Sequence, residues 1–143
     1  MDLLFFANTR HLKRADARLA TMGLGRAHHR VLYFVQRKPG LPLTELLNIL
    51  GVSKQSFGRV SHYLTERGLM EARQRMRDRR ERLLYLTPAG EELEREIFGE
   101  LHDNVLCAYT ASGGEAVRGL WIVLPHLIGD EGREQFRALN ERL

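Results

Sequence analysis

The chain has 143 residues, 43% of them hydrophobic, which is typical of one soluble domain with its own core. No apolar run reaches the roughly 18 residues that a membrane span needs, and this excludes an integral membrane protein. The hydrophobic start, Met1 to Phe6, lacks the basic flank and cleavage site of an export signal. The single cysteine, Cys107, cannot form an internal disulfide and suits a reducing compartment. We therefore expect a cytoplasmic protein.

The charge is distributed unevenly along the chain. Residues 1–82 carry 17 basic and 7 acidic side chains, whereas residues 83–143 carry 5 and 11. Residues 73–82 alone hold six arginines and two acids, a net charge of +4, which equals the net charge of the whole chain. Such a local excess of positive charge favours a surface that binds nucleic acid. The alternative is a solvated hairpin tip with no ligand.

The first predicted helix covers residues 3–22, and a second covers about 26–37, separated by the break at residues 23–25. The apolar cluster at the start of the first helix is too hydrophobic for a free helix end. It packs either within the chain or against a second subunit, and we favour the second subunit. Residues 41–43 are expected to form a short extended piece that pairs with a later hairpin.

The centre of the chain predicts two short helices joined by a tight turn. Leu46, Leu47 and Leu50 recur at the three- and four-residue spacing of a helix that buries one face. Gly51 then suits a left-handed helix end, and Ser53 suits the N-cap of the next helix. That second helix buries Phe57, Val60 and Leu64 on one face. The arrangement is typical of a helix-turn-helix.

A β-hairpin is predicted next. Residues 69–73 and 83–86 are rich in residues that favour strands, and the arginine-dense segment joins them. Thr87 and Pro88 then suit the N-cap and first position of a helix. This helix is expected to reach about Tyr109, followed by a loop at residues 112–114. A further helix over residues 116–124 is kinked or ended by Pro125. The last helix spans about residues 130–142.

Together these features resemble the MarR family of bacterial transcriptional regulators. The match is carried by Leu46 to Ser53, the helix to Leu64, Gly68-Leu69, Asp78-Arg79-Arg80 and Leu86-Thr87-Pro88-Ala89-Gly90. The resemblance implies a mainly α fold with a small β-hairpin wing (α+β), a winged helix-turn-helix with N- and C-terminal dimerisation helices. Within one domain of residues 1–143, residues 25–90 would bind DNA, and residues 1–22 and 91–143 would form the dimer. The apolar chain ends also favour an intertwined homodimer, for which the candidate contacts are Leu3, Leu4, Phe5, Phe6, Phe136 and Leu139.

The predicted recognition helix supplies the residues expected to contact the major groove. Glutamine can pair with adenine and arginine with guanine through two hydrogen bonds each, and serine hydroxyls can hold phosphates. For each residue the alternative is a solvated surface side chain. Gly58 costs roughly 1 kcal/mol inside a helix, which a close approach to DNA or to a neighbouring helix would explain. The candidate DNA contacts are Ser53, Lys54, Gln55, Ser56 and Arg59.

In the wing, Arg80 is the candidate for the minor groove, because a planar, weakly hydrated guanidinium suits a narrow A·T-rich groove. The resemblance implies that Asp78 orients an arginine through a salt bridge. The remaining wing arginines are expected to contact phosphates; these are Arg75, Arg77, Arg79 and Arg82.

The sequence gives no sign of a catalytic or metal site. It contains no nucleophile–base pair, no phosphate-binding glycine loop and no metal-ligand spacing, so we expect neither an enzyme nor a cofactor. Cys107 is expected to be a buried small residue. We predict a sequence-specific regulator, a repressor that binds a pseudo-palindromic duplex as a homodimer. Members of the family commonly bind a small-molecule effector, and the sequence leaves open whether this chain does. The alternative is a winged-helix module for protein docking or RNA binding.

Overall fold

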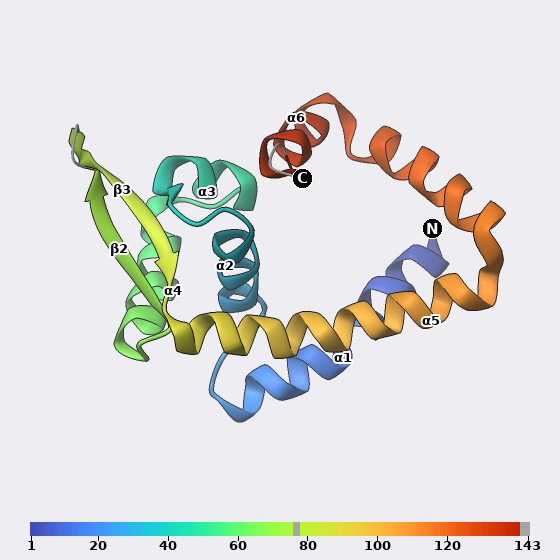
Figure 1. Cartoon of the computed structure of the whole chain (residues 1–143), viewed down its shortest axis with the longest axis horizontal. Helices are drawn as coiled ribbons and strands as arrows, with labels where there is room; N and C mark the ends of the chain where they lie inside the picture. The colour runs from blue at the N-terminus through green and yellow to red at the C-terminus, as the bar shows by residue number, and fades with distance from the viewer. Residues whose placement is uncertain (76–77, 141–143) are drawn as a thin grey trace. The chain divides into compact units, whose positions relative to one another are not determined.

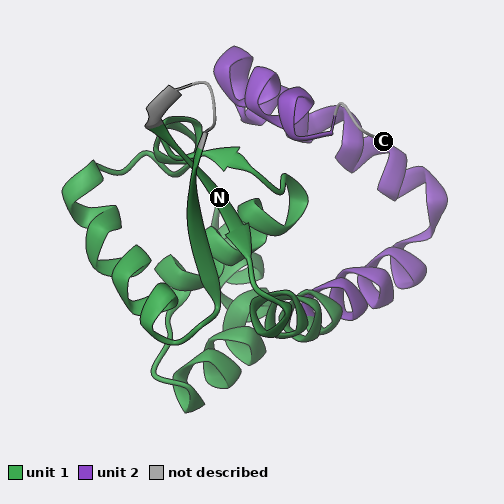
Figure 2. Cartoon of the chain, turned by 60° about the vertical axis from the view of Figure 1, so that its left-hand side comes forward, with its two compact units in different colours: residues 1–100 green, residues 101–143 purple. Residues whose placement is uncertain are grey.

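The computed structural model describes residues 1–75 and 78–140, and the side chains of residues 75–80 lie outside that description. The chain is mainly helical with one small antiparallel sheet, which confirms the predicted fold class. Figure 1 labels the elements in chain order, and Figure 2 colours two compact units, residues 1–100 and 101–143. The elements are α1 (Asp2–Thr21), α2 (Arg26–Arg37), β1 (Leu41–Pro42), α3 (Leu43–Leu50), α4 (Lys54–Glu66), β2 (Met70–Arg75), β3 (Asp78–Leu86), α5 (Pro88–Leu127) and α6 (Gly129–Asn140).

The turn between α3 and α4 forms as its residues predict. Gly51 adopts the left-handed conformation, with φ 66° and ψ 35°, which a residue without Cβ reaches at little cost. Ser53 caps α4, since its hydroxyl accepts a hydrogen bond from the Ser56 amide at 3.2 Å. These two residues end one helix and begin the next within three positions, which fixes the angle at which α4 leaves the turn.

The sheet has the strand order β1-β3-β2, and both pairings are antiparallel. Leu41 pairs with Leu84 and Met70 with Leu86, so the expected pairing of residues 41–43 with the hairpin is confirmed for Leu41 and Pro42. A register shift between Gln74 and Arg75 interrupts the β2–β3 pairing near the tip. Such irregularities bend a strand and increase its twist.

The junction between β3 and α5 explains the motif Leu86-Thr87-Pro88-Ala89-Gly90. The Thr87 hydroxyl accepts from the Gly90 amide at 3.1 Å and donates to the Gly68 carbonyl at 2.5 Å. A Cβ on Gly90 would lie 1.9 Å from the carbonyl oxygen of Leu69. Glycine is therefore required at position 90, because the first turn of α5 lies directly against the backbone between α4 and β2.

The first unit contains the hydrophobic core. Leu19, Leu32, Leu46 and Leu64 each have none of their surface exposed, and Leu84 has 1%. They come from α1, α2, α3, α4 and β3, so one interior joins every layer of the unit. Burying a leucine side chain contributes about 1.5–3 kcal/mol. This core fixes the outward orientation of the opposite face of α4.

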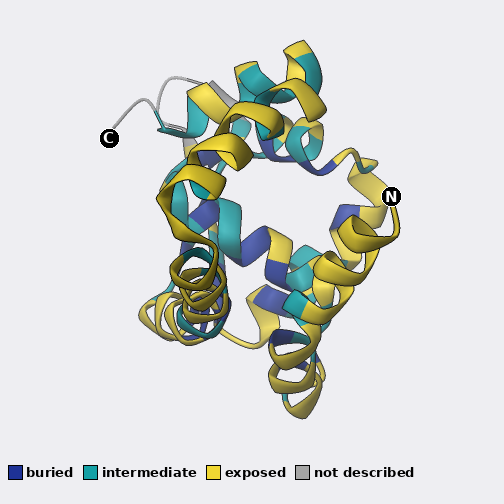
Figure 3. Ribbon diagram, turned by 90° about the vertical axis from the view of Figure 1, so that its right-hand side faces the viewer, coloured by how far each residue is buried: buried dark blue, intermediate teal, exposed yellow. Residues whose placement is uncertain are grey.

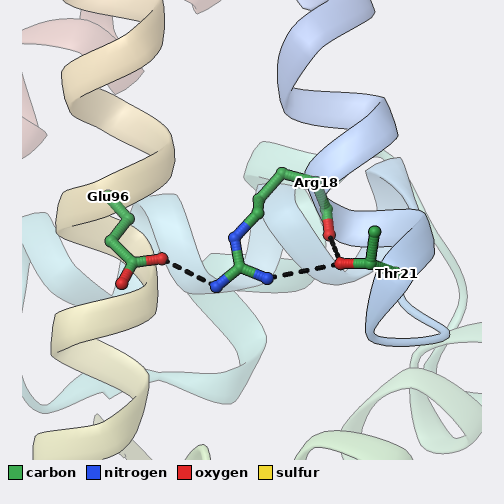
Figure 4. Close-up of polar contacts among 3 residues, drawn as sticks. All are labelled: Arg18, Thr21 and Glu96. Carbon is green, nitrogen blue, oxygen red and sulfur yellow. Dashed lines mark hydrogen bonds and ion pairs between the residues drawn. The ribbon is translucent and has the colours of Figure 1, made fainter.

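Ion pairs attach the beginning of α5 to α1 and α2. In Figure 4, Arg18 on α1 donates to Glu96 on α5 at 2.9 Å and to the Thr21 hydroxyl at 3.3 Å. On α2, Arg37 donates to Glu94 at 3.1 Å, and its guanidinium lies 3.4 Å from the centroid of the Tyr33 ring. The Glu94 side chain is only 5% exposed, so this second pair is largely removed from water.

The C-terminal elements differ in detail from the prediction. The break expected at residues 112–114 lies at Gly113, whose φ of 78° and ψ of 162° are not helical, so α5 consists of two helical segments joined by a kink and not by a longer loop. Pro125 lies inside α5 and does not end it. The last helix begins at Gly129, whose φ of 70° turns the chain after α5. Among the described residues, no helix is long and apolar enough to cross a membrane.

Candidate nucleic-acid interface

The outward face of α4 carries the polar residues predicted for the recognition helix. Lys54, Gln55 and Arg59 are exposed, whereas Phe57 is 4% and Leu64 0% exposed. The buried residues attach α4 to the core, so the polar residues can contact a ligand only from outside. Gln55 and Arg59 are one helical turn apart and therefore lie on the same face.

Ser53 and Ser56 are both exposed, but their hydroxyls are already engaged. Besides accepting from the Ser56 amide, the Ser53 hydroxyl donates to the Ser56 hydroxyl at 3.1 Å. This leaves Ser53 chiefly a capping residue, with the positive end of the helix dipole beside it. A phosphate near this end would meet the first amides of α4, which is how helix N-termini bind anions.

Gly58 lies in the middle of α4, where glycine costs stability. A Cβ at Gly58 would meet no atom of the described residues within 4 Å. A close approach to a neighbouring helix of the same chain therefore does not account for this glycine. The close approach to DNA that the sequence also suggested stays a prediction.

Arg30 is a residue of this region that the sequence did not single out. Its Nη2 donates to the carbonyl oxygen of Leu50, the last residue of α3, at 3.0 Å. Arg30 also lines a small apolar cavity with Ser56 and Phe57 of α4. It thereby connects α2 to the turn that orients the recognition helix. No sequence pattern could reveal this contact, because the acceptor is a backbone carbonyl 20 residues away.

The wing is described only in part. Arg82 is exposed on β3, opposite Gln74 on β2. Arg73 lies over the Tyr85 ring, with 4.5 Å between the guanidinium carbon and the ring centroid, and it pairs with Glu71. Arg77 lies outside the described residues, as do the side chains of Arg75, Asp78, Arg79 and Arg80. The minor-groove role of Arg80 and the orienting role of Asp78 therefore stay predictions.

The histidines and the cysteine form no metal site among the described residues, where no group of three or more metal-binding side chains occurs. His28 caps its own helix, since its Nδ1 accepts from the Gly25 amide at 3.0 Å. Burial lowers the pKa of His28, and burial together with the nearby Arg37 charge lowers the pKa of His29. Cys107 is exposed, so the expectation that it is buried is wrong. On α5 the buried apolar side chains are Leu93, Ile97 and Leu101, all before Cys107.

The predicted dimer contacts at the chain ends are accessible in the single chain. Leu3, Phe5 and Phe6 are 86%, 70% and 57% exposed, and Phe136 is 51% exposed. Leu4 is also exposed, at 49%, and Leu139 is partly buried. Such a concentration of exposed apolar side chains is unusual for a monomer in water.

The fold and this interface define a winged helix-turn-helix protein. Residues 22–81 match the model of the MarR family. The HTH-type transcriptional regulator PetP of Rhodobacter capsulatus is 39% identical over 141 residues, covering 99% of this chain and 85% of PetP. The chain therefore belongs to the MarR family. It is a DNA-binding transcriptional regulator and not an enzyme.

Solved structures share the fold at lower sequence identity. NadR in complex with 4-hydroxyphenylacetate superposes with a TM-score of 0.75 at 21% identity, covering 88% of this chain and 89% of that one. The MepR–DNA complex of S. aureus gives 0.68 at 16% identity, covering 88% and 93%. At these identities the likeness concerns the fold alone.

Proposed function

We propose that the chain binds a pseudo-palindromic DNA operator as a homodimer and represses transcription by occupying that site in the cytoplasm. The observation that carries the proposal is the two-sided α4, whose apolar face is buried and whose Lys54, Gln55 and Arg59 are exposed. An α-helix fits the major groove, where each base pair presents a distinct set of donors and acceptors. Gln55 and Arg59 would read bases there, while Lys54 and Ser56 would hold phosphates.

The wing would add affinity without much sequence preference. Arg82 is exposed, and Arg75, Arg77, Arg79 and Arg80 precede it in the sequence. Each phosphate that these cations neutralise would release counterions from the DNA and make binding salt-dependent. In this proposal Arg80 enters the minor groove, and Asp78 orients a neighbouring arginine.

The second subunit is supported by the exposed apolar residues at both chain ends. Residues 1–22 and 91–143 would form the dimer, and residues 25–90 would bind DNA. Light scattering should find a dimer at micromolar concentration, and deletion of residues 1–10 should give a monomer or an aggregate. A monomeric full-length protein would contradict both the dimer and the palindromic operator.

The class of ligand is tested by a gel shift. The protein should bind duplex DNA from upstream of its own gene at lower concentration than scrambled duplex or RNA of equal length. Equal binding to the RNA would favour an RNA-binding module instead. NadR was crystallised with 4-hydroxyphenylacetate, which supports a small-molecule effector for this chain as well.

A further inference from the structure

Ion pairs neutralise some basic side chains around the helix-turn-helix and leave others unpaired. Residues 17–65 contain seven lysines and arginines but a single carboxylate, Glu45. Four of these cations pair with carboxylates of the chain; the pairs are Arg18–Glu96, Arg26–Asp16, Arg37–Glu94 and Lys38–Glu45. Among the described residues, no carboxylate pairs with the remaining three, which are Arg30, Lys54 and Arg59. Positive charge is therefore left unbalanced at these three positions.

Two of the three unpaired cations, Lys54 and Arg59, are the exposed basic residues of the recognition helix α4. The third, Arg30, lies on α2 and is also exposed. Its Nη2 donates to the carbonyl oxygen of Leu50 at 3.0 Å, and Leu50 ends α3 just before the turn to α4. The Arg30 guanidinium is therefore held beside the turn from which the recognition helix begins.

The contacts of Arg30 order its side chain but do not neutralise its charge. Arg30 lines a cavity of about 110 Å³ together with Ser56 and Phe57, so its stem lies against the first turns of α4. The Leu50 carbonyl is one of the last of α3, which have no acceptor role within the helix and favour a cation nearby. A guanidinium has five N–H donors, and the hydrogen bond to Leu50 uses one of them. An ordered cation with donors to spare is thus placed beside α4.

We propose that Arg30 binds a phosphate of the DNA backbone at the edge of the groove that α4 enters. Arginine can hold a phosphate through two parallel hydrogen bonds. Because the Arg30 side chain is already ordered, little conformational entropy is lost when the phosphate binds. Contacts of this kind fix the position of a protein on the duplex without reading its sequence. The inference rests on the proposed DNA binding and adds a contact from α2 to those of α4 and the wing.

The salt dependence of binding tests this contact. Each phosphate contact contributes about 0.9 to the slope of log K against log salt concentration on duplex DNA. Arg30→Gln should therefore reduce the slope by about 0.9 per protomer. It should weaken binding to the duplex from upstream of the gene and to a scrambled duplex by the same factor, about tenfold at low salt. Arg30→Lys should keep most of the slope, because lysine binds phosphate as a point charge.

The control variant is Arg26→Gln, one turn before Arg30 on the same helix. The charge of Arg26 is balanced by Asp16, whose carboxylate oxygens accept its hydrogen bonds at 2.6–3.0 Å. Arg26→Gln changes the formal charge of the substituted side chain as Arg30→Gln does, and it should keep the wild-type slope. Equal reductions of the slope in Arg26→Gln and Arg30→Gln would reflect net charge alone and would overturn the proposal.

The hydrogen bond to Leu50 gives Arg30 a structural role as well, so the free energy of unfolding of each variant is measured beside its DNA binding. A purely structural role would lower the stability of Arg30→Gln, or change its base preference through α4, and would leave the slope at the wild-type value. Either result would overturn the phosphate contact. Arg30→Met, which keeps an apolar stem over the cavity, is a second variant without the charge and should show the same reduced slope.

The scrambled duplex distinguishes this proposal from the proposed function. Equal binding of the wild type to both duplexes would contradict sequence-specific regulation, while the slope on either duplex would still report on Arg30. An unchanged slope in Arg30→Gln, together with a wild-type preference for the upstream duplex, would contradict the phosphate contact alone.

Discussion

The two units of the chain differ in how far their apolar side chains are buried. In residues 1–100, Leu32, Leu46 and Leu64 are completely buried, whereas Trp121, Ile122 and Leu127 in the second unit are 52%, 65% and 60% exposed. Figure 3 colours the ribbon by burial, and exposed residues predominate outside the core of the first unit. Past Leu101, no apolar side chain of the described residues is buried. The first unit supplies its own interior, whereas the proposed second subunit would cover the apolar surface of the second unit.

The largest effect is expected where α5 leaves the wing. Gly90→Ala would place a Cβ 1.9 Å from the Leu69 carbonyl oxygen, so the free energy of unfolding should fall by more than about 4 kcal/mol, or the chain should fail to fold. A Cβ at Gly99 in the same helix would meet no atom of the described part of the chain within 4 Å, so Gly99→Ala should stabilise the protein by up to about 1 kcal/mol. Chemical denaturation measures both. Wild-type stability of Gly90→Ala would contradict the packing at this junction.

A matched pair of truncations tests the comparison between the units. Leu46→Ala removes a side chain with no exposed surface and should cost about 2–5 kcal/mol of unfolding free energy at any protein concentration. Ile122→Ala, at a residue that is 65% exposed, should cost less than about 0.5 kcal/mol in dilute protein. Its effect should grow with concentration, because it weakens association. A large, concentration-independent loss for Ile122→Ala would show that the second unit has a core of its own.

The ion pair between α2 and α5 should contribute less than the core leucine. Glu94→Gln leaves Arg37 without its carboxylate, and since the Glu94 side chain is 5% exposed and that of Arg37 27%, a loss of about 2–3 kcal/mol is expected. Glu92→Gln removes an exposed carboxylate that pairs with Arg95 and should change stability by less than about 1 kcal/mol. Thermal unfolding of both variants makes the comparison, and equal losses would mean that burial of Glu94 is unimportant.

The smallest effect concerns pH and is confined to the first unit. Burial lowers the folded-state pKa of His28 and His29, so below about pH 6.5 the unfolded chain binds more protons than the folded one. The stability that the two neutral histidines contribute is fully present above that pH. It is lost as the pH falls, by at most about 1.4 kcal/mol per pH unit for each histidine. The free energy of unfolding should differ less between pH 7.5 and pH 5.5 for His29→Gln than for wild type. The exposed His126→Gln is the control, and an unchanged difference in His29→Gln would exclude this role.

The sequence predicted those parts of the fold that depend on neighbouring residues. Gly51, Ser53 and Pro88 act within one turn of their positions, and their helix ends were located from residue type alone. Contacts between distant residues were not predictable. Arg37 and Glu94 are 57 positions apart, and neither differs in pattern from the other charged residues of its helix.

The C-terminal unit shows a second reason for error. Gly113 divides α5 into two helical segments with a single non-helical residue, and composition does not distinguish such a one-residue kink from the short loop predicted at residues 112–114. The exposure of Cys107 has a related cause. The spacing of apolar residues predicts which face of a helix is packed against other residues. It does not indicate whether those residues belong to the same chain or to another one.

The most direct test of the account is a salt titration of DNA binding for wild type, Gln55→Ala and Arg80→Ala, on a selected operator and on a scrambled duplex. Gln55→Ala should lose about 1–3 kcal/mol on the operator and relax the preference at one position in each half-site, with half-sites centred about 34–36 Å apart. Arg80→Ala should weaken both duplexes more evenly and lower the dependence on salt. The opposite result would be an altered base preference in Arg80→Ala together with an equal loss on both duplexes in Gln55→Ala. It would contradict the proposal that α4 determines sequence preference and that the wing contributes affinity with little sequence preference.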